Sequence, residues 1–267
     1  MDKTNFIFNI DKLDEFRAVI SDLSKINTIL KLKMDNDSLL LYSIATAGEG
    51  SSMGHATALA VKAYSFPSEY FMKLKHYDES NDTRGKIDWI IRNGVVLNKR
   101  MNFFDGNADI KGVFNLRKLS NDDEVKYTRN VVMTDNKFKF STTGDEPHVV
   151  RDMPLTLMRT ILDPELSELS FSIPSSEFLN ARTASNVESE DIVTIYISGG
   201  KVYFRQSSWE LLVGTTEFKG DRKISFHKKY LKSINPSNEV VDFMVFPTFV
   251  LYKEDNQKLI ISYEQEF

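Results

Sequence analysis

The feature that most constrains the fold of this chain is an internal repeat. A strand-like segment, an amphipathic helical segment and two more strand-like segments occur near the start, at residues 6–10, 13–26, 28–33 and 38–42. The same order returns in the last third, at residues 169–173, 175–186, 192–197 and 201–205. Self-similarity over so long a period predicts one supersecondary unit used twice. With no catalytic motif in either copy, the duplication favours a scaffold over an enzyme.

The repeat continues after an interruption. The first copy continues with four later segments, at 109–114, 116–119, 124–129 and 137–140. They match, in the same order, 222–226, 227–234, 239–246 and 249–253 of the second copy. The second segment of each set is predicted to be a short helix. Residues of about 65–105 have no match and predict an insertion, with a helix at 67–77 and a hairpin at 86–98 around Asn93-Gly94. Prolines 147, 154 and 164 predict an extended connector. We therefore predict an N-terminal domain at 1–145, a connector at 146–167 and a C-terminal domain at 168–267.

Composition places the chain among globular proteins of a reducing compartment. Of its 267 residues, 41% are hydrophobic and 27% are charged. No apolar run reaches the roughly 18 residues of a membrane span, and the first residues lack the apolar core of a secretory signal. The absence of cysteine excludes disulfides and thiolate metal sites. We expect a cytoplasmic protein, or one of the host cytoplasm if a phage encodes it, with no membrane partner.

Sequence motifs for chemistry are missing. Phosphate-binding, dinucleotide-binding, nucleophile-elbow and zinc-protease patterns do not occur. The four histidines are scattered, and the best metal lookalike, 105–109, lacks the glycine and the glutamate of a calcium loop. We therefore expect no catalytic residue, no metal and no cofactor. An enzyme with a site made of ordinary carboxylates ranks last among the alternatives.

Basic residues recur on the predicted helices, although the net charge of the chain is -4. They are Arg17 and Lys25 on the first long helix, Arg182 on the second, Arg117 and Lys118 on one short helix, and Lys228, Lys229 and Lys232 on the other. On any single helix such residues most simply keep the surface soluble. Their recurrence at matched places predicts a positive stripe suited to the phosphate backbone, without reading of bases. No aromatic residues are interleaved, so stacking on single strands is not indicated.

The strongest match to a known family lies in the last hundred residues. Residues 224–234 carry a Phe-x-x-x-Tyr-Leu core, three strand-like segments follow at 240–246, 247–253 and 258–263, and 173–178 reads Ile-Pro-Ser-Ser-Glu-Phe. This order resembles DNA sliding clamps of the proliferating-cell nuclear antigen and T4-like phage type. The resemblance implies an α+β DNA-clamp fold of two similar domains, each with antiparallel sheets outside and two helices on the inner face.

The resemblance also implies a function and a set of sites. A clamp is a closed ring, here a homotrimer, which a clamp loader places around duplex DNA and which tethers the replicative DNA polymerase. The basic residues named above would face the DNA, with Arg17, Arg182 and Lys228 on the best-aligned helices. Partner peptides would enter a pocket whose matching positions are Ile44, Ala45, Leu155, Leu157 and Pro247.

Two further hypotheses compete with the ring. One keeps the fold but makes the protein a monomeric or dimeric processivity factor that holds DNA electrostatically. The other is a β-rich viral structural protein, which would not explain basic helices at matched positions. For the clamp, charge reversal at Lys228, Lys229 and Lys232 together is expected to impair loading without unfolding, because exposed charges contribute little to stability.

Overall fold

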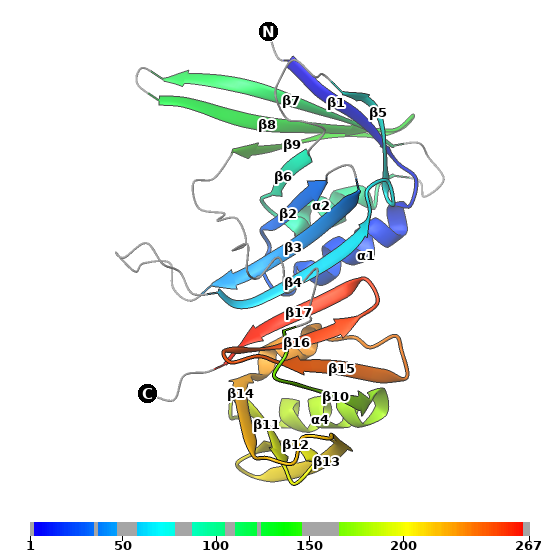
Figure 1. Cartoon of the computed structure of the whole chain (residues 1–267). Coiled ribbons are helices and arrows are strands. Elements are labelled where there is room, and N and C mark those ends of the chain that lie inside the picture. Colours follow the sequence, from blue (N-terminus) through cyan, green and yellow to red (C-terminus); the bar gives the residue numbers. More distant parts are fainter. Residues whose placement is uncertain are drawn as a thin grey trace. The chain divides into compact units, whose positions relative to one another are not determined.

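The computed structural model describes residues 3–34, 37–46, 58–77, 87–104, 110–121, 124–145 and 166–263 of the chain. Two compact units are distinguished, one made of Met1–Ser43 with Tyr64–Met153 and the other of Ile44–Ala63 with Pro154–Phe267. Figure 1 labels the elements of both. Over the described ranges, no helix combines the length and the apolar character needed to cross a membrane.

The described residues of the first unit form antiparallel strands and two helices. Its elements in chain order are β1 (Lys3–Ile10), α1 (Leu13–Leu23), β2 (Leu30–Met34), β3 (Ser38–Thr46), β4 (Ala58–Pro67), β5 (Met72–Tyr77), β6 (Ile87–Ile91), α2 (Gly94–Met101), β7 (Ile110–Asn121), β8 (Glu124–Thr134) and β9 (Lys139–Asp145), of which β3 and β4 cross the unit boundary. One sheet has the order β5-β1-β7-β8-β9, and β3, β2 and β6 are neighbours in another.

The second unit follows the same plan. Its elements are β10 (Leu169–Pro174), α4 (Ser175–Val187), β11 (Ile192–Ser198), β12 (Lys201–Gln206), β13 (Trp209–Thr215), β14 (Arg222–His227), the 3-10 helix η2 (Lys228–Ser233), β15 (Val240–Val245), β16 (Phe249–Glu254) and β17 (Gln257–Ser262). One sheet contains β10-β15-β16-β17 in that order, and a second has the order β13-β12-β11-β14.

Strand pairing confirms that one unit is used twice, but the predicted match of 109–114 to 222–226 is wrong, because residues 110–114 lie in β7, whose counterpart is β15, while 222–226 lie in β14. In each unit the first strand pairs with the strand after the second helix, as β1 with β7 and β10 with β15. The strand after the first helix pairs with the strand before the second helix, as β2 with β6 and β11 with β14. Among the described elements of the first unit, β5 alone lacks a counterpart, and it pairs with the other edge of β1.

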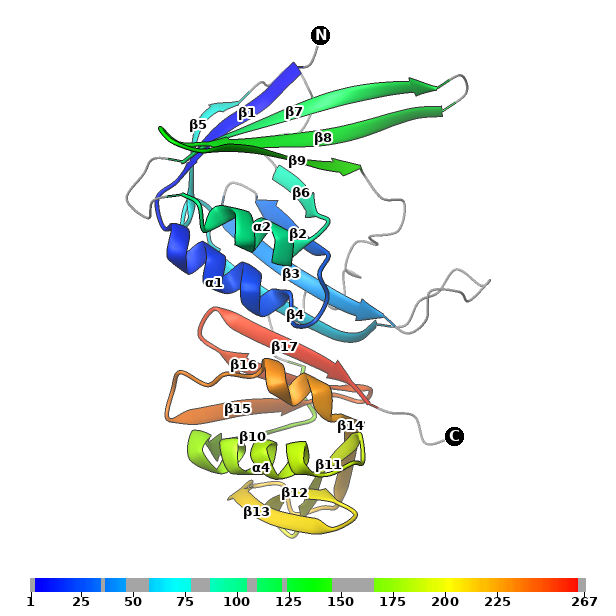
Figure 2. The same cartoon turned by 180° about the vertical axis from the view of Figure 1, so that it is seen from behind.

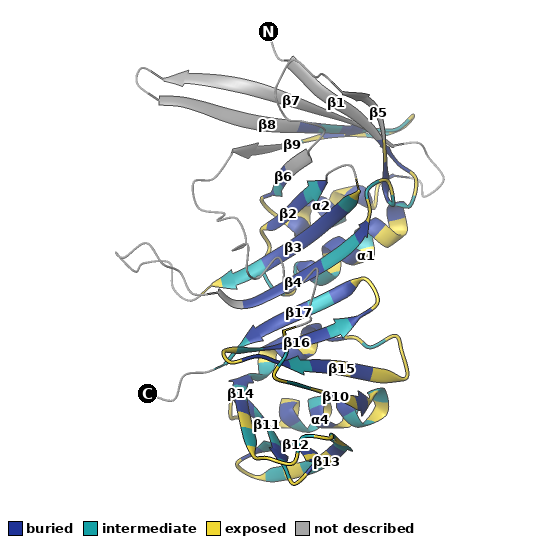
Figure 3. Cartoon of the chain, in the orientation of Figure 1, coloured by how far each residue is buried: buried dark blue, intermediate teal, exposed yellow. Residues whose placement is uncertain are grey.

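Alternating burial explains why these segments are strands. Along β11 the side chains of Val193, Ile195 and Ile197 are buried and those between them are not, which is the period of a strand with one covered face. Figure 3 shows this alternation through the second unit. Helix α4 inserts Phe178 between the two sheets of the unit, with its ring 6.2 Å from that of Phe204 on β12 and 6.1 Å from that of Phe243 on β15. The core of this unit is therefore a helix packed on both of its sheets.

Three local predictions in the first unit are wrong. The predicted helix at 67–77 is the end of β4 followed by β5, because these residues supply a strand to the edge of β1. The predicted hairpin at 86–98 is β6 followed by α2, since Asn93 caps a helix: its side chain accepts a hydrogen bond from the Val96 N–H at 3.0 Å. The predicted short helix at 116–119 is the middle of β7, which pairs with β8 from Lys111 to Asn121.

These corrections bear on the predicted insertion. Within the range 65–105, β6 and α2 have counterparts in β14 and η2, which leaves β5 as the unmatched element. The predicted domain limits stay predictions, and most of the predicted connector, 146–165, lies outside the described residues.

The segment that ends in β5 belongs to the core of the first unit. Phe71 and Met72 are fully buried. The Phe71 ring lies 5.5 Å from that of Phe16 on α1 and 4.6 Å from that of Phe66 on β4. Rings at these separations and tilts make favourable contacts beyond the apolar area that they bury. The unmatched segment thus joins α1 to the sheets of its unit.

Helix α2 begins at a glycine because it starts in close contact with its surroundings. A Cβ atom at Gly94 would lie 2.4 Å from Ser24 Oγ and 2.6 Å from Cδ1 of the buried Leu30. The backbone is held there by a hydrogen bond from the Gly94 N–H to the Thr28 carbonyl at 2.7 Å. The first position of α2, Gly94, therefore has no room for a side chain.

Replacing this glycine should destabilise the protein. We expect Gly94→Ala to lower the free energy of unfolding by about 1–2 kcal/mol, because overpacking outweighs the better helix propensity of alanine. Thermal or urea unfolding would measure the change. Val95→Ala, at an exposed position of the same helix, is the matched control and should stay near wild type. A Gly94→Ala protein as stable as wild type would contradict the close contact.

Candidate nucleic-acid interface

Arg17, predicted to face DNA, joins the two helices of the first unit. Helices α1 and α2 lie side by side (Figure 2), and the buried residues of α1 leave Arg17 at the rim of its apolar face. Its guanidinium donates to Asn98 Oδ1 on α2 at 3.3 Å and also to the side chain of Asn102. It pairs with Asp14 at 3.2 Å as well. Arg17 therefore cross-links the helix pair, and its charge is partly compensated.

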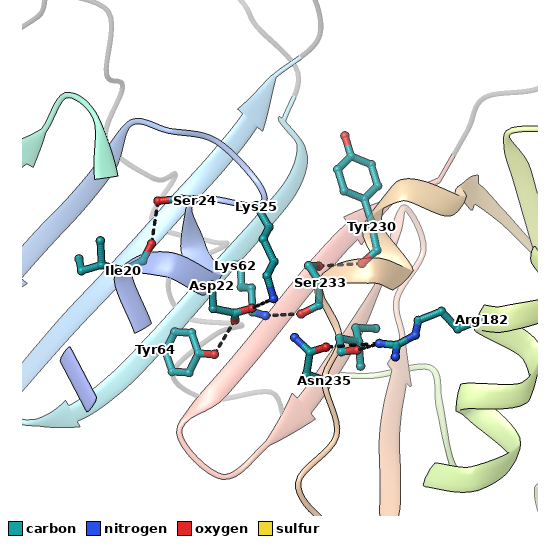
Figure 4. A network of polar contacts seen from close by, with 11 residues as sticks. Ile20, Asp22, Ser24, Lys25, Lys62, Tyr64, Arg182, Tyr230, Ser233 and Asn235 are labelled. Atoms are coloured by element: carbon teal, nitrogen blue, oxygen red, sulfur yellow. Dashed lines mark hydrogen bonds and ion pairs between the residues drawn. The ribbon is translucent and has the colours of Figure 1, made fainter. Parts of the chain in front are cut away.

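Lys25, the other predicted base of this helix, lies just beyond the end of α1. Its Nζ atom is 3.0 Å from Asp22 Oδ1, while Asp22 Oδ2 accepts a hydrogen bond from the Tyr64 hydroxyl at 2.6 Å (Figure 4). The Lys25 side chain is about half exposed. It remains accessible to a ligand, but it has a carboxylate beside it.

Arg182 has the same structural role in the second unit that Arg17 has in the first. Its guanidinium, on α4, donates to the Ile234 carbonyl at 2.5 Å and to Asn235 Oδ1 at 3.4 Å, immediately after η2 (Figure 4). In both units an arginine on the longer helix thus holds the shorter helix or the residue that follows it. The spacing of basic residues in the sequence gave no sign of this contact.

Lys228 is largely buried, so its predicted contact with DNA is not favoured by its surroundings. Only 12% of its side chain is exposed. Its Nζ atom donates to the Glu188 carbonyl at 2.5 Å and lies 3.8 Å from Asp191 Oδ1. Lys228 holds the start of η2 against the residues that follow α4.

Lys229 and Lys232 are exposed on the same short helix, η2, and hydrogen bonds fix both of its ends. The fully buried Lys62, in the same unit, donates to the Ser233 carbonyl at the end of η2 (Figure 4). At the other end, the His227 side chain accepts from the Lys229 N–H at 3.2 Å. Two ammonium groups are thereby presented to solvent from a fixed backbone.

Two basic residues that sequence reasoning missed lie in the last turn of α2. Lys99 and Arg100 are exposed there, and α2 is the counterpart of η2. The signal was available: Asn93 is a good N-cap, and Leu97 and Met101 are four residues apart on one face. By contrast, Arg117 and Lys118 lie on β7, so their predicted place on a short helix is wrong.

A buried carboxylate fixes the loop that follows η2. Glu254 Oε1 accepts hydrogen bonds from the Ser237 and Asn238 N–H groups, both at 2.6 Å, and from Ser237 Oγ at 2.9 Å. The Tyr252 hydroxyl donates to Oε2. Burial by itself would raise the pKa of Glu254, but these hydrogen bonds to the charged form outweigh it and lower the pKa. The ionised carboxylate therefore holds the chain between η2 and β15.

The predicted peptide pocket is only partly described. Ile44 and Ala45 lie half-buried near the end of β3. Pro247 was expected at a strand start or edge, but it lies exposed in the turn between β15 and β16, where the Phe246 N–H bonds to the Phe249 carbonyl at 2.9 Å. Leu155 and Leu157 lie outside the described residues. The pocket stays a prediction.

Comparison with solved structures identifies the fold. The proliferating cellular nuclear antigen of Entamoeba histolytica matches with a TM-score of 0.61 and 14% identity over 99% of this chain and 100% of that one. The DNA polymerase sliding clamp of Pseudomonas aeruginosa matches with a TM-score of 0.65 and 13% identity over 99% of this chain and 67% of the other. The Helicobacter pylori β clamp bound to a DNA ligase peptide gives 0.64 and 10% over the same shares. No protein-family model and no curated protein matches the sequence.

The class of fold that these structures share with the chain is a duplicated α+β unit. More specifically, the chain has the DNA sliding clamp fold, as the sequence predicted. It spans the whole length of the Entamoeba histolytica chain and about two thirds of the bacterial clamp chains.

Proposed function

We propose that the protein is a sliding clamp, a ring that encircles duplex DNA and tethers the replicative DNA polymerase. The observation that supports this most is the pairing of the clamp fold with exposed bases on the second helix of each unit. These are Lys99 and Arg100 on α2, and Lys229 and Lys232 on η2. The chain is acidic overall, but it carries exposed cations at both of these matched places. Such cations are suited to contact a polyanion such as DNA.

The proposed contact with DNA is electrostatic and independent of sequence. Lysine and arginine side chains attract phosphates and release counterions, while no base needs to be read. Weak contacts of this kind let a protein move along the duplex, and a closed ring keeps it there by topology. The protein itself needs no catalytic group for this role.

The structure changes which residues we assign to the DNA surface. Lys99, Arg100, Lys229 and Lys232 are the exposed candidates, together with the half-exposed Lys25 just beyond the end of α1. Arg17, Arg182 and Lys228 hold the helices in place, so we assign them an indirect role. Lys99 and Arg100 take the place that was expected for Arg117 and Lys118.

We further propose a homotrimer, a clamp loader and peptide-bearing partners. A chain of two clamp units would place six units in a ring of three copies, and the match to the Entamoeba histolytica antigen covers the whole of that chain. The Helicobacter pylori structure contains a peptide from DNA ligase. Short segments of partner proteins would bind here near Ile44, Ala45 and Pro247, together with Leu155 and Leu157.

The ring is tested by solution mass and by the salt dependence of DNA binding. Light scattering behind size exclusion should give roughly three times the 30.7 kDa of one chain across a dilution series. Linear duplex without a loader should bind weakly, because nothing stops the ring from leaving its ends. A monomer with strong, salt-sensitive binding to linear duplex would instead favour the electrostatic processivity factor.

A further inference from the structure

The sheet β13-β12-β11-β14 of the second unit has one covered face and one open face. Helix α4 packs on the covered face, where Phe178 meets the buried Phe204. Along β11 and β12, the residues that alternate with the buried ones are partly or fully exposed, so their side chains lie on the opposite face. The sheet is therefore an antiparallel platform with a helix behind it and an open surface in front.

One row of paired residues crosses the open face on all of its strands. Tyr196 on β11 lies directly opposite Tyr203 on β12, so the two central strands each supply a tyrosine. On the outer strands, Leu212 pairs with Tyr203 and Lys223 pairs with Tyr196. Both tyrosines are half-buried, Leu212 is 49% exposed and Lys223 is exposed. We call these four residues, with Arg205 in the adjoining row, the tyrosine face.

The two tyrosine rings lie side by side, and a cation supports one of them. The ring centroids are 6.3 Å apart and the ring planes are tilted by 32°. The Arg205 guanidinium lies 4.2 Å from the centre of the Tyr196 ring, where it is attracted to the ring face. The middle of the sheet thus presents the Tyr203 ring next to a guanidinium stacked on the Tyr196 ring.

The tyrosine face is positively charged, although the net charge of the chain is -4. Arg205 is partly compensated by Glu210, which lies 3.9 Å away on β13, and Lys223 carries its charge at the opposite side of the sheet. Aromatic rings among cations are the combination by which proteins bind single strands, because the rings stack on bases and the cations attract phosphates. The charge and the aromatic groups of this face therefore suit the same ligand.

We infer that the tyrosine face binds single-stranded nucleic acid, with one base stacked on Tyr203 and another on the Arg205–Tyr196 pair. Aromatic side chains on a four-stranded sheet stack two or three unpaired bases in a known mode of single-strand recognition, and guanidinium planes also serve as stacking surfaces. The exposed lysines of η2 do not offer this, since the aromatic residue between them, Tyr230, is buried. The inference goes beyond the proposed clamp function and does not depend on a ring.

An acidic peptide is the other anion that cations on a sheet could attract. Such a peptide would pair with Arg205 and Lys223, but its carboxylates would not stack on the tyrosine rings. Flat bases use both properties of the tyrosine face, which is why we favour a nucleic acid. Removal of a ring without a change of charge separates the two ligands.

Fluorescence anisotropy with a labelled oligothymidylate of about 10 nucleotides tests the inference on the full chain. Wild type should bind this probe at low salt. Tyr203→Ala should weaken binding about 10-fold or more, because one stacked base is lost without any change of charge. Tyr203→Phe keeps the ring and is the matched control, with an affinity close to that of wild type. Lys223→Ala should lower the slope of log affinity against log salt by about 0.7, the value for one phosphate contact to a single strand.

The opposing outcomes are equally specific. Because Tyr203 is half-buried and Lys223 is exposed, both variants should keep the thermal midpoint of wild type, and the salt slope of Lys223→Ala decides the matter if Tyr203→Ala does not fold. No binding by wild type, or equal binding by wild type and both variants, would overturn the inference. Oligoglutamate that displaces the probe as well as unlabelled oligothymidylate of equal charge would also overturn it, in favour of an acidic peptide. Oligouridylate distinguishes RNA from DNA, and stacking-dependent binding of either supports the inference. The proposed ring is tested separately by the solution mass.

Discussion

Reversing the charge of the two exposed lysines of η2, in a Lys229→Glu/Lys232→Glu variant, should lower processive DNA synthesis at least about 10-fold without unfolding the protein. Each copy loses two cations and gains two carboxylates on the surface that we propose faces the phosphates, and every copy in the proposed ring carries the change. Neither side chain holds another element, and exposed charges add little to stability. The thermal midpoint should therefore stay close to that of wild type.

Primer extension on a long singly primed template, with the cognate polymerase and loader, measures this effect. Lys201→Glu/Lys219→Glu is the matched control, because it makes the same change of charge at two exposed lysines outside the helices. The control should keep wild-type product length. Wild-type product length in the η2 variant would remove this helix from the DNA surface.

Charge reversal at Lys228 should affect stability more than charge reversal at Lys229 or Lys232. The comparison separates a structural role from a role in DNA binding. It donates to the Glu188 carbonyl and is mostly buried, so Lys228→Glu should destabilise the second unit. From the sequence we expected that the charges of all three lysines could be reversed without unfolding the protein. We now expect this for Lys229 and Lys232 only. Denaturant unfolding of the single variants measures the difference.

Removal of the Glu254 carboxylate should cause a large loss of stability. Glu254→Ala leaves the Ser237 and Asn238 N–H groups and the Tyr252 hydroxyl without their acceptor. We expect the free energy of unfolding to fall by about 2–4 kcal/mol, since four hydrogen bonds to one buried, charged acceptor are lost together. Urea unfolding measures this, and Asn256→Ala, at an exposed position two residues further along the chain, is the control.

The same carboxylate makes part of the stability dependent on pH. Because folding lowers the pKa of Glu254, its contribution is complete above the pKa of an unfolded glutamate and is lost as the pH falls through the folded pKa. Lowering the pH should therefore reduce the difference in the free energy of unfolding between wild type and Glu254→Gln. A gap that stays constant from neutral pH down to the acid transition would contradict this role.

Much of the fold could be predicted from the sequence because its strongest signals are local. Alternating residues such as Val193, Ile195 and Ile197 indicate strands directly, and two such series in the same order reveal the repeat. Helix α2 was missed because Asn93-Gly94 is equally typical of a hairpin turn and of a helix start. Only the packing of Gly94 against Ser24 and Leu30 distinguishes the two, and that packing joins residues far apart in the chain.

The candidate site was harder to predict than the fold, since its geometry depends on distant partners. Arg17 and Asn98 are 81 residues apart, and no spacing rule links them. The recurrence of basic residues pointed to α1, α4 and η2 but missed α2, and it could not separate a cation that holds a helix from one that faces solvent. Burial and hydrogen bonding make that distinction for Lys228 against Lys229 and Lys232.

The segment before β5 has become part of what stabilises the first unit. It has no counterpart in the second unit, yet Phe71 now fills the space between Phe16 and Phe66. Truncating a buried phenylalanine costs about 3–5 kcal/mol, which is a large part of the stability of an ordinary domain. A descendant that lost this segment would first have to repack the surrounding core. An unmatched strand at the edge of a sheet is therefore also part of the hydrophobic core on which its unit depends.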